Sequence, residues 1–180
     1  MEIKRVAVVG AGTMGSGIAH CFAQHGFETT LIEASQDIAD KAIKSISSNM
    51  DRQVAKNILT AEQKARALAR LKACLDLDAA ADADLVVEAV PEIFVLKNDI
   101  FGRLDALCRP QAILASNTSS LPSTSIAAAT KRADKVIGMH FMNPVPVMKL
   151  VELIRGLATS DETYQTVHAL TLALDKTPAC

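Results

Sequence analysis

Residues 3–15 read IKRVAVVGAGTMG, an apolar run followed by three spaced glycines. The Val-rich run predicts a strand, and the glycines predict a tight turn into a helix that begins near Thr13. Gly10 lets the chain turn sharply, Gly12 lets the backbone approach a ligand, and Gly15 lets the helix lie close to the sheet. Because unpaired N–H groups give a helix N-terminus roughly half a positive charge, this arrangement is typical of pyrophosphate binding.

An acidic residue follows the second predicted strand, residues 29–32. Glu33 lies near the spacing of about 20 residues at which an acid binds the adenosine ribose. A carboxylate there repels the 2′-phosphate of NADP, so the sequence favours NAD. The glycine turn supplies the remaining expected cofactor contacts, which are Gly10, Ala11, Gly12, Thr13, Met14 and Gly15.

Length and composition restrict the class of protein. The 180 residues, 49% of them hydrophobic, are enough for one domain with a substantial core. A net charge of −1 and an aromatic content of 3% argue against nucleic acid as a partner. No apolar run approaches the roughly 18 residues of a membrane span, and no signal peptide is evident, so we expect a cytoplasmic protein. Four scattered cysteines without a C-x-x-C pair predict no metal site.

Strand-like and helix-like segments alternate along the chain. Apolar runs predict buried strands at residues 85–90, 112–116, 136–141 and 150–154, and periodic segments predict helices at 13–26, 93–107 and 161–174. Two more helices, capped by Ser35 and by Thr60 with Gln63, form an insertion after strand two. His20 and His25 are interpreted as polar-face residues of the first helix. The fold class is α/β, a doubly wound Rossmann-type, mostly parallel sheet with this helical insertion.

Polar residues beyond the carboxyl ends of the strands are candidates for chemistry, because ligands of open α/β sheets lie there. His140 ends an apolar strand just before Asn143, and Glu152 lies on the next strand, where a tight connection returns it beside the imidazole. An imidazole whose Nδ1–H is held by a carboxylate is oriented and made more basic. This pair suits removal of a hydroxyl proton during hydride transfer. A structural histidine is the alternative.

Two further candidates lie in loops at the same edge. Glu92 follows the strand at 85–90, and Ser119 lies in a hydroxyl-rich loop after the strand at 112–116. The Ser119 hydroxyl is suited to bond a reacting oxygen or the nicotinamide, whereas the alternative is that it caps a short helix at 123–129. The chain has no G-x-S-x-G motif, so a serine nucleophile is disfavoured.

Three motifs together resemble the L-3-hydroxyacyl-CoA dehydrogenase family, and most closely its single-function 3-hydroxybutyryl-CoA dehydrogenases. They are GAGTMG at 10–15, SNTSS at 116–120 and GMHFMNPVPVMKLVE at 138–152. The resemblance runs from end to end of the chain, and its third motif is long and specific. It implies reversible, NAD-dependent oxidation of an (S)-3-hydroxyacyl-CoA to the 3-ketoacyl-CoA.

The resemblance also implies roles for individual residues. His140 is implied to be the acid–base and Glu152 its partner. Ser119 is implied to contact both substrate and cofactor, and Asn143 to lie beside the nicotinamide.

Further contacts follow from the same resemblance. Glu33 is implied to be the ribose acid, and Glu92 and Lys97 are implied to be additional NAD contacts. Asn49 and Lys56, on the long helix after strand two, are implied to bind CoA. For Lys56, a solvated helical lysine is the equal alternative.

Beyond this domain, the family carries a helical C-terminal domain that supplies a catalytic asparagine, closes the substrate cleft and builds a homodimer. Residues 1–180 correspond to the NAD-binding domain, so we expect them to belong to a longer protein. Two alternatives for function stay open. One is a dehydrogenase of a free hydroxy acid, such as carnitine or a sugar acid. The other is nucleotide binding without turnover by these 180 residues alone.

Overall fold

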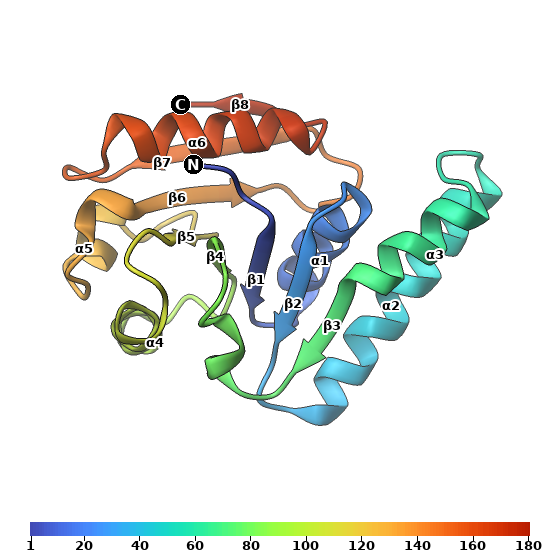
Figure 1. The fold of residues 1–180 in the computed structure, drawn as a ribbon, viewed down its shortest axis with the longest axis horizontal. Helices are drawn as coiled ribbons and strands as arrows, with labels where there is room; N and C mark the ends of the chain where they lie inside the picture. The colour runs from blue at the N-terminus through green and yellow to red at the C-terminus, as the bar shows by residue number, and fades with distance from the viewer.

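One sheet of eight strands runs through the protein, which a computed structural model describes over all residues, Met1–Cys180 (Figure 1). The strands are β1 (Arg5–Val9), β2 (Glu28–Ile32), β3 (Leu71–Cys74), β4 (Leu85–Glu88), β5 (Ile113–Ser116), β6 (Val136–Phe141), β7 (Leu150–Arg155) and β8 (Thr177–Ala179). Their order is β3-β2-β1-β4-β5-β6-β7-β8. The first six are parallel, and β7 and β8 run in the opposite direction. The mostly parallel Rossmann-type sheet expected from the sequence is confirmed.

Helices cover both faces of this sheet. They are α1 (Thr13–Gln24), α2 (Gln36–Ala55), α3 (Ala61–Arg70), α4 (Phe94–Leu107), α5 (Ser123–Ala127) and α6 (Asp161–Ala173), with 3-10 turns at Leu77–Ala80 and Ala133–Lys135. Residues of α1, α2, α3 and α6 join a cluster of 26 buried apolar residues on one face. Residues of α4 and α5 join a second cluster of 16 on the other. Two covered faces explain why β4 is buried along its whole length.

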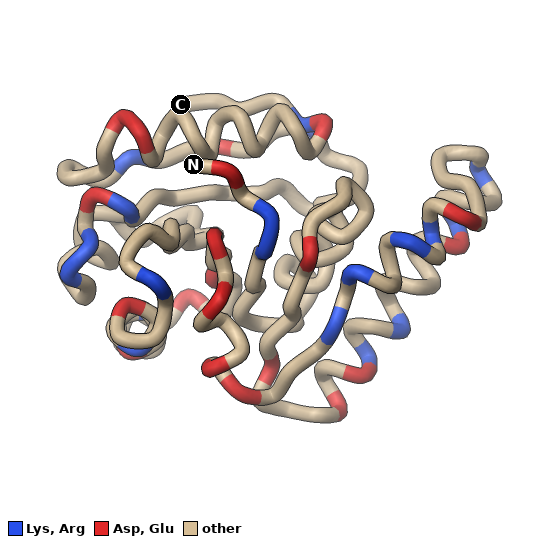
Figure 2. The backbone as a smooth tube through the Cα atoms, viewed as in Figure 1, with Lys and Arg blue, Asp and Glu red and all other residues tan.

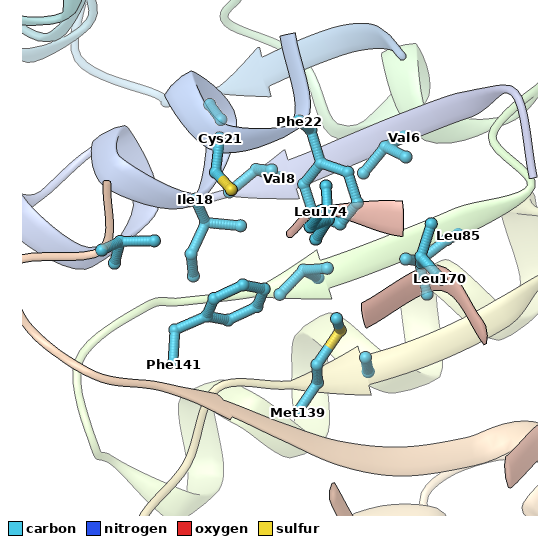
Figure 3. Close-up of a cluster of buried hydrophobic side chains, with 14 of the residues drawn as sticks. Val6, Val8, Ile18, Cys21, Phe22, Leu85, Met139, Phe141, Leu170 and Leu174 are labelled. Carbon is cyan, nitrogen blue, oxygen red and sulfur yellow. The ribbon is translucent and has the colours of Figure 1, made fainter. Parts of the chain in front are cut away.

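The larger cluster fixes α1 against the strands that carry the site. Figure 3 shows Ile18 and Phe22 of α1 reaching toward Met139 and Phe141 of β6. The rings of Phe22 and Phe141 meet edge to face with centroids 6.4 Å apart. Each large side chain buried here contributes roughly 1.5–3 kcal/mol. This packing therefore holds the glycine turn before α1 near the end of β6.

The expected helical insertion projects from the body as α2 and α3 (Figure 1), with charges of both signs along it (Figure 2). The Ser35 hydroxyl accepts from the Ile38 N–H, and Thr60 and Gln63 form the expected capping box. The insertion ends in β3, a strand that the sequence did not predict. This strand is short, lies at the edge of the sheet and pairs only with β2, so it lacks the apolar run of a buried strand.

His20 differs from its sequence interpretation, because it is a buried residue with 1% of its surface exposed. Its Nε2 lies 2.9 Å from the side-chain oxygen of Gln24 and 3.0 Å from that of Gln53. Burial lowers the pKa of this imidazole, so it is neutral at pH 7. The interpretation was wrong because α2 lies over this face of α1 and brings Gln53 as a polar partner.

None of the helices combines the length and the apolar character that crossing a bilayer requires.

Candidate active site

The glycine motif forms the turn between β1 and α1. Gly10 has φ +99°, which favours glycine, and a Cβ on it would lie 2.8 Å from the Ala89 carbonyl oxygen. A Cβ on Gly15 would overlap the Gly10 carbonyl oxygen, so α1 meets the turn only without that side chain. A Cβ on Gly12 would meet no protein atom within 4 Å. The turn therefore leaves open space at the N-terminus of α1, which fits a pyrophosphate.

Glu33 lies against this turn. Its two carboxylate oxygens accept hydrogen bonds from the backbone N–H groups of Ala11 at 3.1 Å and Ser35 at 3.2 Å. Glu33 and the glycine turn line a cavity of about 950 Å³ whose walls include Leu75, Leu77 and other apolar residues between β2 and α4. A cavity of this size with a glycine turn, an acid and apolar walls fits a dinucleotide with its adenine end near Glu33.

His140 and Glu152 are directly opposite each other on the antiparallel strands β6 and β7. Nδ1 of His140 lies 2.9 Å from Oε2 of Glu152, and the two side chains are 21% and 45% exposed. With Nδ1–H donating to the carboxylate, Nε2 is the proton acceptor of the ring, and it bonds to no protein group. The pair can therefore accept and return a proton at Nε2.

A cavity of about 290 Å³ at the carboxyl ends of β4, β5 and β6 gathers several of the expected residues. Its lining includes Met14, Glu92, Asn117, Ser119, His140 and Asn143. Met14 also borders the larger cavity, so the two cavities meet at the glycine turn. The structure thus brings the nucleotide turn and the imidazole to the same edge of the sheet.

The structure does not make Ser119 a helix cap. Helix α5 begins at Ser123 after Pro122, without any side-chain cap. The loop is instead held by Thr118, whose hydroxyl accepts from the Leu121 N–H at 3.0 Å and donates to the Glu92 carboxylate. Ser119 is exposed and its hydroxyl has no protein partner, so it is free to bond a ligand in the cavity.

Lys97 lies beneath the cavity rather than on its wall. Its Nζ lies 2.7 and 3.0 Å from the carboxylate oxygens of Glu88, and both side chains are 0% exposed. Glu88 also accepts from the Ser116 hydroxyl at 2.6 Å and the Val90 N–H at 2.7 Å. The expected direct contact of Lys97 with the cofactor is therefore wrong for this structure, because the Lys97 side chain has no exposed surface. The buried pair instead holds the backbone at Val90.

The sequence analysis missed Glu88, although a single acid inside the apolar run at 85–90 was a signal for it. Glu92, in contrast, is exposed on the loop that the buried pair supports, and its carboxylate lies 4.0 Å from Nζ of Lys97. The structure therefore places one acid as a support of the loop and the other on the cavity surface.

Asn49 and Lys56 line a third cavity, of about 500 Å³, between α1, α2 and the segment after β6. Arg52 donates to the Asn49 side-chain oxygen at 3.0 Å, and Lys149 and Lys176 also border this cavity. A hollow of about 340 Å³, lined in part by Asn49 and Asn143, connects it with the glycine turn. These basic side chains suit a phosphate-bearing ligand, although the lining also holds Asp175, which pairs with Lys149.

Comparison with known proteins gives consistent results. Residues 5–180 match the family profile described as "3-hydroxyacyl-CoA dehydrogenase, NAD binding domain". The chain is 48% identical over 174 residues to the 3-hydroxybutyryl-CoA dehydrogenase of Bradyrhizobium diazoefficiens, covering 97% of this chain and 59% of that protein. It is 48% identical over 177 residues to the probable 3-hydroxybutyryl-CoA dehydrogenase of Bacillus subtilis, covering 98% of this chain and 62% of that protein.

Solved structures agree with these relatives. The crystal structure of (S)-3-hydroxybutyryl-CoA dehydrogenase from Ralstonia eutropha superposes with a TM-score of 0.96 at 46% identity, covering 98% of this chain and 62% of that one. A 3-hydroxybutyryl-CoA dehydrogenase from Escherichia coli superposes with a TM-score of 0.97 at 43% identity, covering 99% of this chain and 38% of that one. The chain therefore spans less than two thirds of the length of each of these relatives.

Proposed function

Because this chain belongs to the 3-hydroxyacyl-CoA dehydrogenase family and matches its NAD-binding domain, we propose that the protein reversibly oxidises (S)-3-hydroxyacyl-CoA esters to 3-ketoacyl-CoA esters. The proposed substrate is 3-hydroxybutyryl-CoA, the substrate named for relatives that are 48% identical to this chain. The observation that carries the proposal is the hydrogen-bonded pair of His140 and Glu152 on the cavity next to the glycine turn.

In the oxidative direction, Nε2 of His140 takes the proton of the 3-hydroxyl group while the hydrogen at C3 leaves as hydride. NAD supplies the hydride acceptor when it is bound. Glu152 holds the imidazole in the tautomer with its hydrogen on Nδ1, so that Nε2 can accept the proton. It then stabilises the imidazolium that forms. In the reverse direction, His140 returns the proton to the ketone oxygen. Ser119 donates a hydrogen bond to the same oxygen or to the cofactor.

The proposed cofactor contacts follow the large cavity. The backbone of residues 10–15 binds the pyrophosphate, and Glu33 accepts hydrogen bonds from the adenosine ribose. Glu92 and Asn143 contact the nicotinamide half. Lys97 supports this half from beneath as a positioning residue.

The remaining parts of the proposal concern CoA and the whole protein. Asn49 and Lys56 contact CoA in the basic third cavity. Residues 1–180 form the NAD-binding domain of a longer, cytoplasmic protein that is a homodimer through a second, helical domain. The coverage of 59% and 62% of two relatives supports a continuation beyond this domain.

A turnover assay of the full-length protein tests the function. We expect the protein to reduce acetoacetyl-CoA and longer 3-ketoacyl-CoA esters with NADH. The same reductions should be much slower with NADPH. Dehydrocarnitine and keto sugar acids serve as free-acid controls and should give no turnover. For residues 1–180 alone, calorimetry should show NADH binding. The turnover assay of the same residues should show little activity, because they do not include the cleft-closing domain. Turnover of a free acid but not of CoA esters would contradict the proposal.

Replacing Glu152 with glutamine should lower kcat and move the acidic limb of the pH–rate profile toward lower pH. The neutral amide still accepts from Nδ1–H but no longer stabilises the imidazolium charge. Each loss of about 1.4 kcal/mol in that stabilisation corresponds to a tenfold change in the protonation equilibrium of the imidazole. The measurement is kcat against pH in the oxidative direction, with (S)-3-hydroxybutyryl-CoA and NAD, where Nε2 of His140 has to accept the proton. Glu162→Gln, at the exposed start of α6, is the matched control and should leave the profile unchanged. An unaltered profile for E152Q would exclude the proposed pair.

A further inference from the structure

The backbone ladder that carries His140 is incomplete on one side. Strands β5 and β6 pair only as far as Ser116 with Gly138, whereas β6 continues to Phe141. Over these last residues, β7 is the only neighbouring strand. The end of β6 that carries the imidazole therefore needs another partner on the β5 side, because buried N–H groups are almost always hydrogen-bonded.

The side chain of Asn117 is that partner. Its Oδ1 accepts a hydrogen bond of 2.8 Å from the N–H of Phe141, the residue after His140. The Asn117 backbone N–H donates to the carbonyl oxygen of Glu88 at 2.8 Å. One residue thus joins the ends of β4, β5 and β6, and its backbone bonds to Glu88, the acid of the buried pair.

This contact decides which way the amide of Asn117 points. A backbone N–H can only donate, so the atom facing Phe141 must be the oxygen. The amide nitrogen is then left with two N–H donors, and no protein group accepts from them. Asn117 lines the cavity that also holds Ser119 and His140. Its side-chain nitrogen has no protein partner and is accessible from outside the protein. The two free donors therefore face this cavity.

We propose that Asn117 is a substrate-binding residue whose amide nitrogen donates a hydrogen bond to the C3 oxygen of the acyl group. This inference rests on the proposed function. When hydride adds to C3 of the ketone, this oxygen gains negative charge and takes its proton from His140. A donor held in place by Phe141 stabilises that charge without having to reorganise.

Two substitutions at this position separate the donor from the anchor. Asn117→Asp keeps an oxygen for the Phe141 N–H and removes both donors, whereas Asn117→Ala removes oxygen and donors together. Ser120→Asp places an equal charge on an exposed position of the same loop and controls for electrostatics. Each variant is made in the full-length protein, and its Tm, its NADH affinity by calorimetry and its kinetics with acetoacetyl-CoA are measured.

We expect Asn117→Asp to lower kcat/KM by at least about 100-fold, the loss typical for one donor to a developing oxyanion. Its Tm should stay within about 2 °C of the parent, and its Kd for NADH should stay within about threefold. Asn117→Ala should lose as much activity and in addition several degrees of Tm. S120D should keep both activity and Tm.

Several results would overturn the inference. Near-parental activity of N117D would reduce Asn117 to an anchor. Weakening of NADH binding that matches the kinetic loss would assign the donors to the nicotinamide carboxamide instead. A Tm of N117D as low as that of N117A would contradict the anchoring geometry. If the parent itself does not reduce acetoacetyl-CoA, the proposed function fails, and that result is distinct from all of these.

Discussion

Replacing His140 with alanine in the full-length protein lowers kcat for acetoacetyl-CoA by about 10²–10⁴-fold, the range typical of a lost acid–base group. Alanine cannot hold or return the proton of the 3-oxygen. Glu152 does not take over this role, because it lies on the Nδ1 side of the ring, away from Nε2.

The affinity for NADH should be nearly unchanged in this variant. The glycine turn lies between β1 and α1 and Glu33 directly follows β2, and these elements keep their packing when one side chain on β6 is shortened. Calorimetry with NADH and stopped-flow kinetics separate the two effects. His168→Ala, on α6 and away from the cavity, is the matched control and should keep its turnover. An H140A enzyme that retains most of its activity would refute the assigned role.

Replacing Gly15 with alanine should remove NADH binding and destabilise the domain. The added Cβ overlaps the Gly10 carbonyl oxygen, which is backbone and cannot move aside without opening the turn. Overpacking a core typically costs about 1–3 kcal/mol, and a backbone clash lies at or beyond the upper end of that range. The measurements are thermal unfolding and NADH calorimetry on residues 1–180.

Gly12→Ala is the matched control within the same turn. Its Cβ meets no protein atom within 4 Å, so the Tm should stay close to that of the parent. Binding of NADH should nevertheless weaken by at least about tenfold, because the methyl group occupies space meant for the pyrophosphate. Unchanged NADH affinity in G12A would place the pyrophosphate elsewhere. A Gly15→Ala variant with parental Tm and affinity would contradict the packing of α1 on the turn.

The parts of the fold that the sequence predicted correctly have strong local signals. The glycine motif, the apolar run at 85–90 and the caps at Ser35 and Thr60 each act within a few residues of chain. β3 lacked such a signal, because a four-residue edge strand is defined by its pairing with β2 and not by its own composition.

The site was predictable only in part for the same reason. The glycine turn and Glu33 follow from spacing, and the approach of Glu152 to His140 follows from a short return between two strands. The burial of Lys97 depends on Glu88, and the role proposed for Asn117 depends on Phe141. One contact joins a helix to a strand and the other joins a loop to a strand, and neither residue type nor periodicity specifies them.

The antiparallel pairing of β6 with β7 has a consequence for how such a site can diversify. Backbone bonds along both strands, and not the connecting residues 142–149, keep the imidazole and the carboxylate opposite each other. The connection is held separately, by Lys176, which donates to the carbonyl oxygens of Val145 and Met148. The sequence of this connection can therefore change, and with it the lining of the neighbouring hollows, while His140 and Glu152 stay opposite each other.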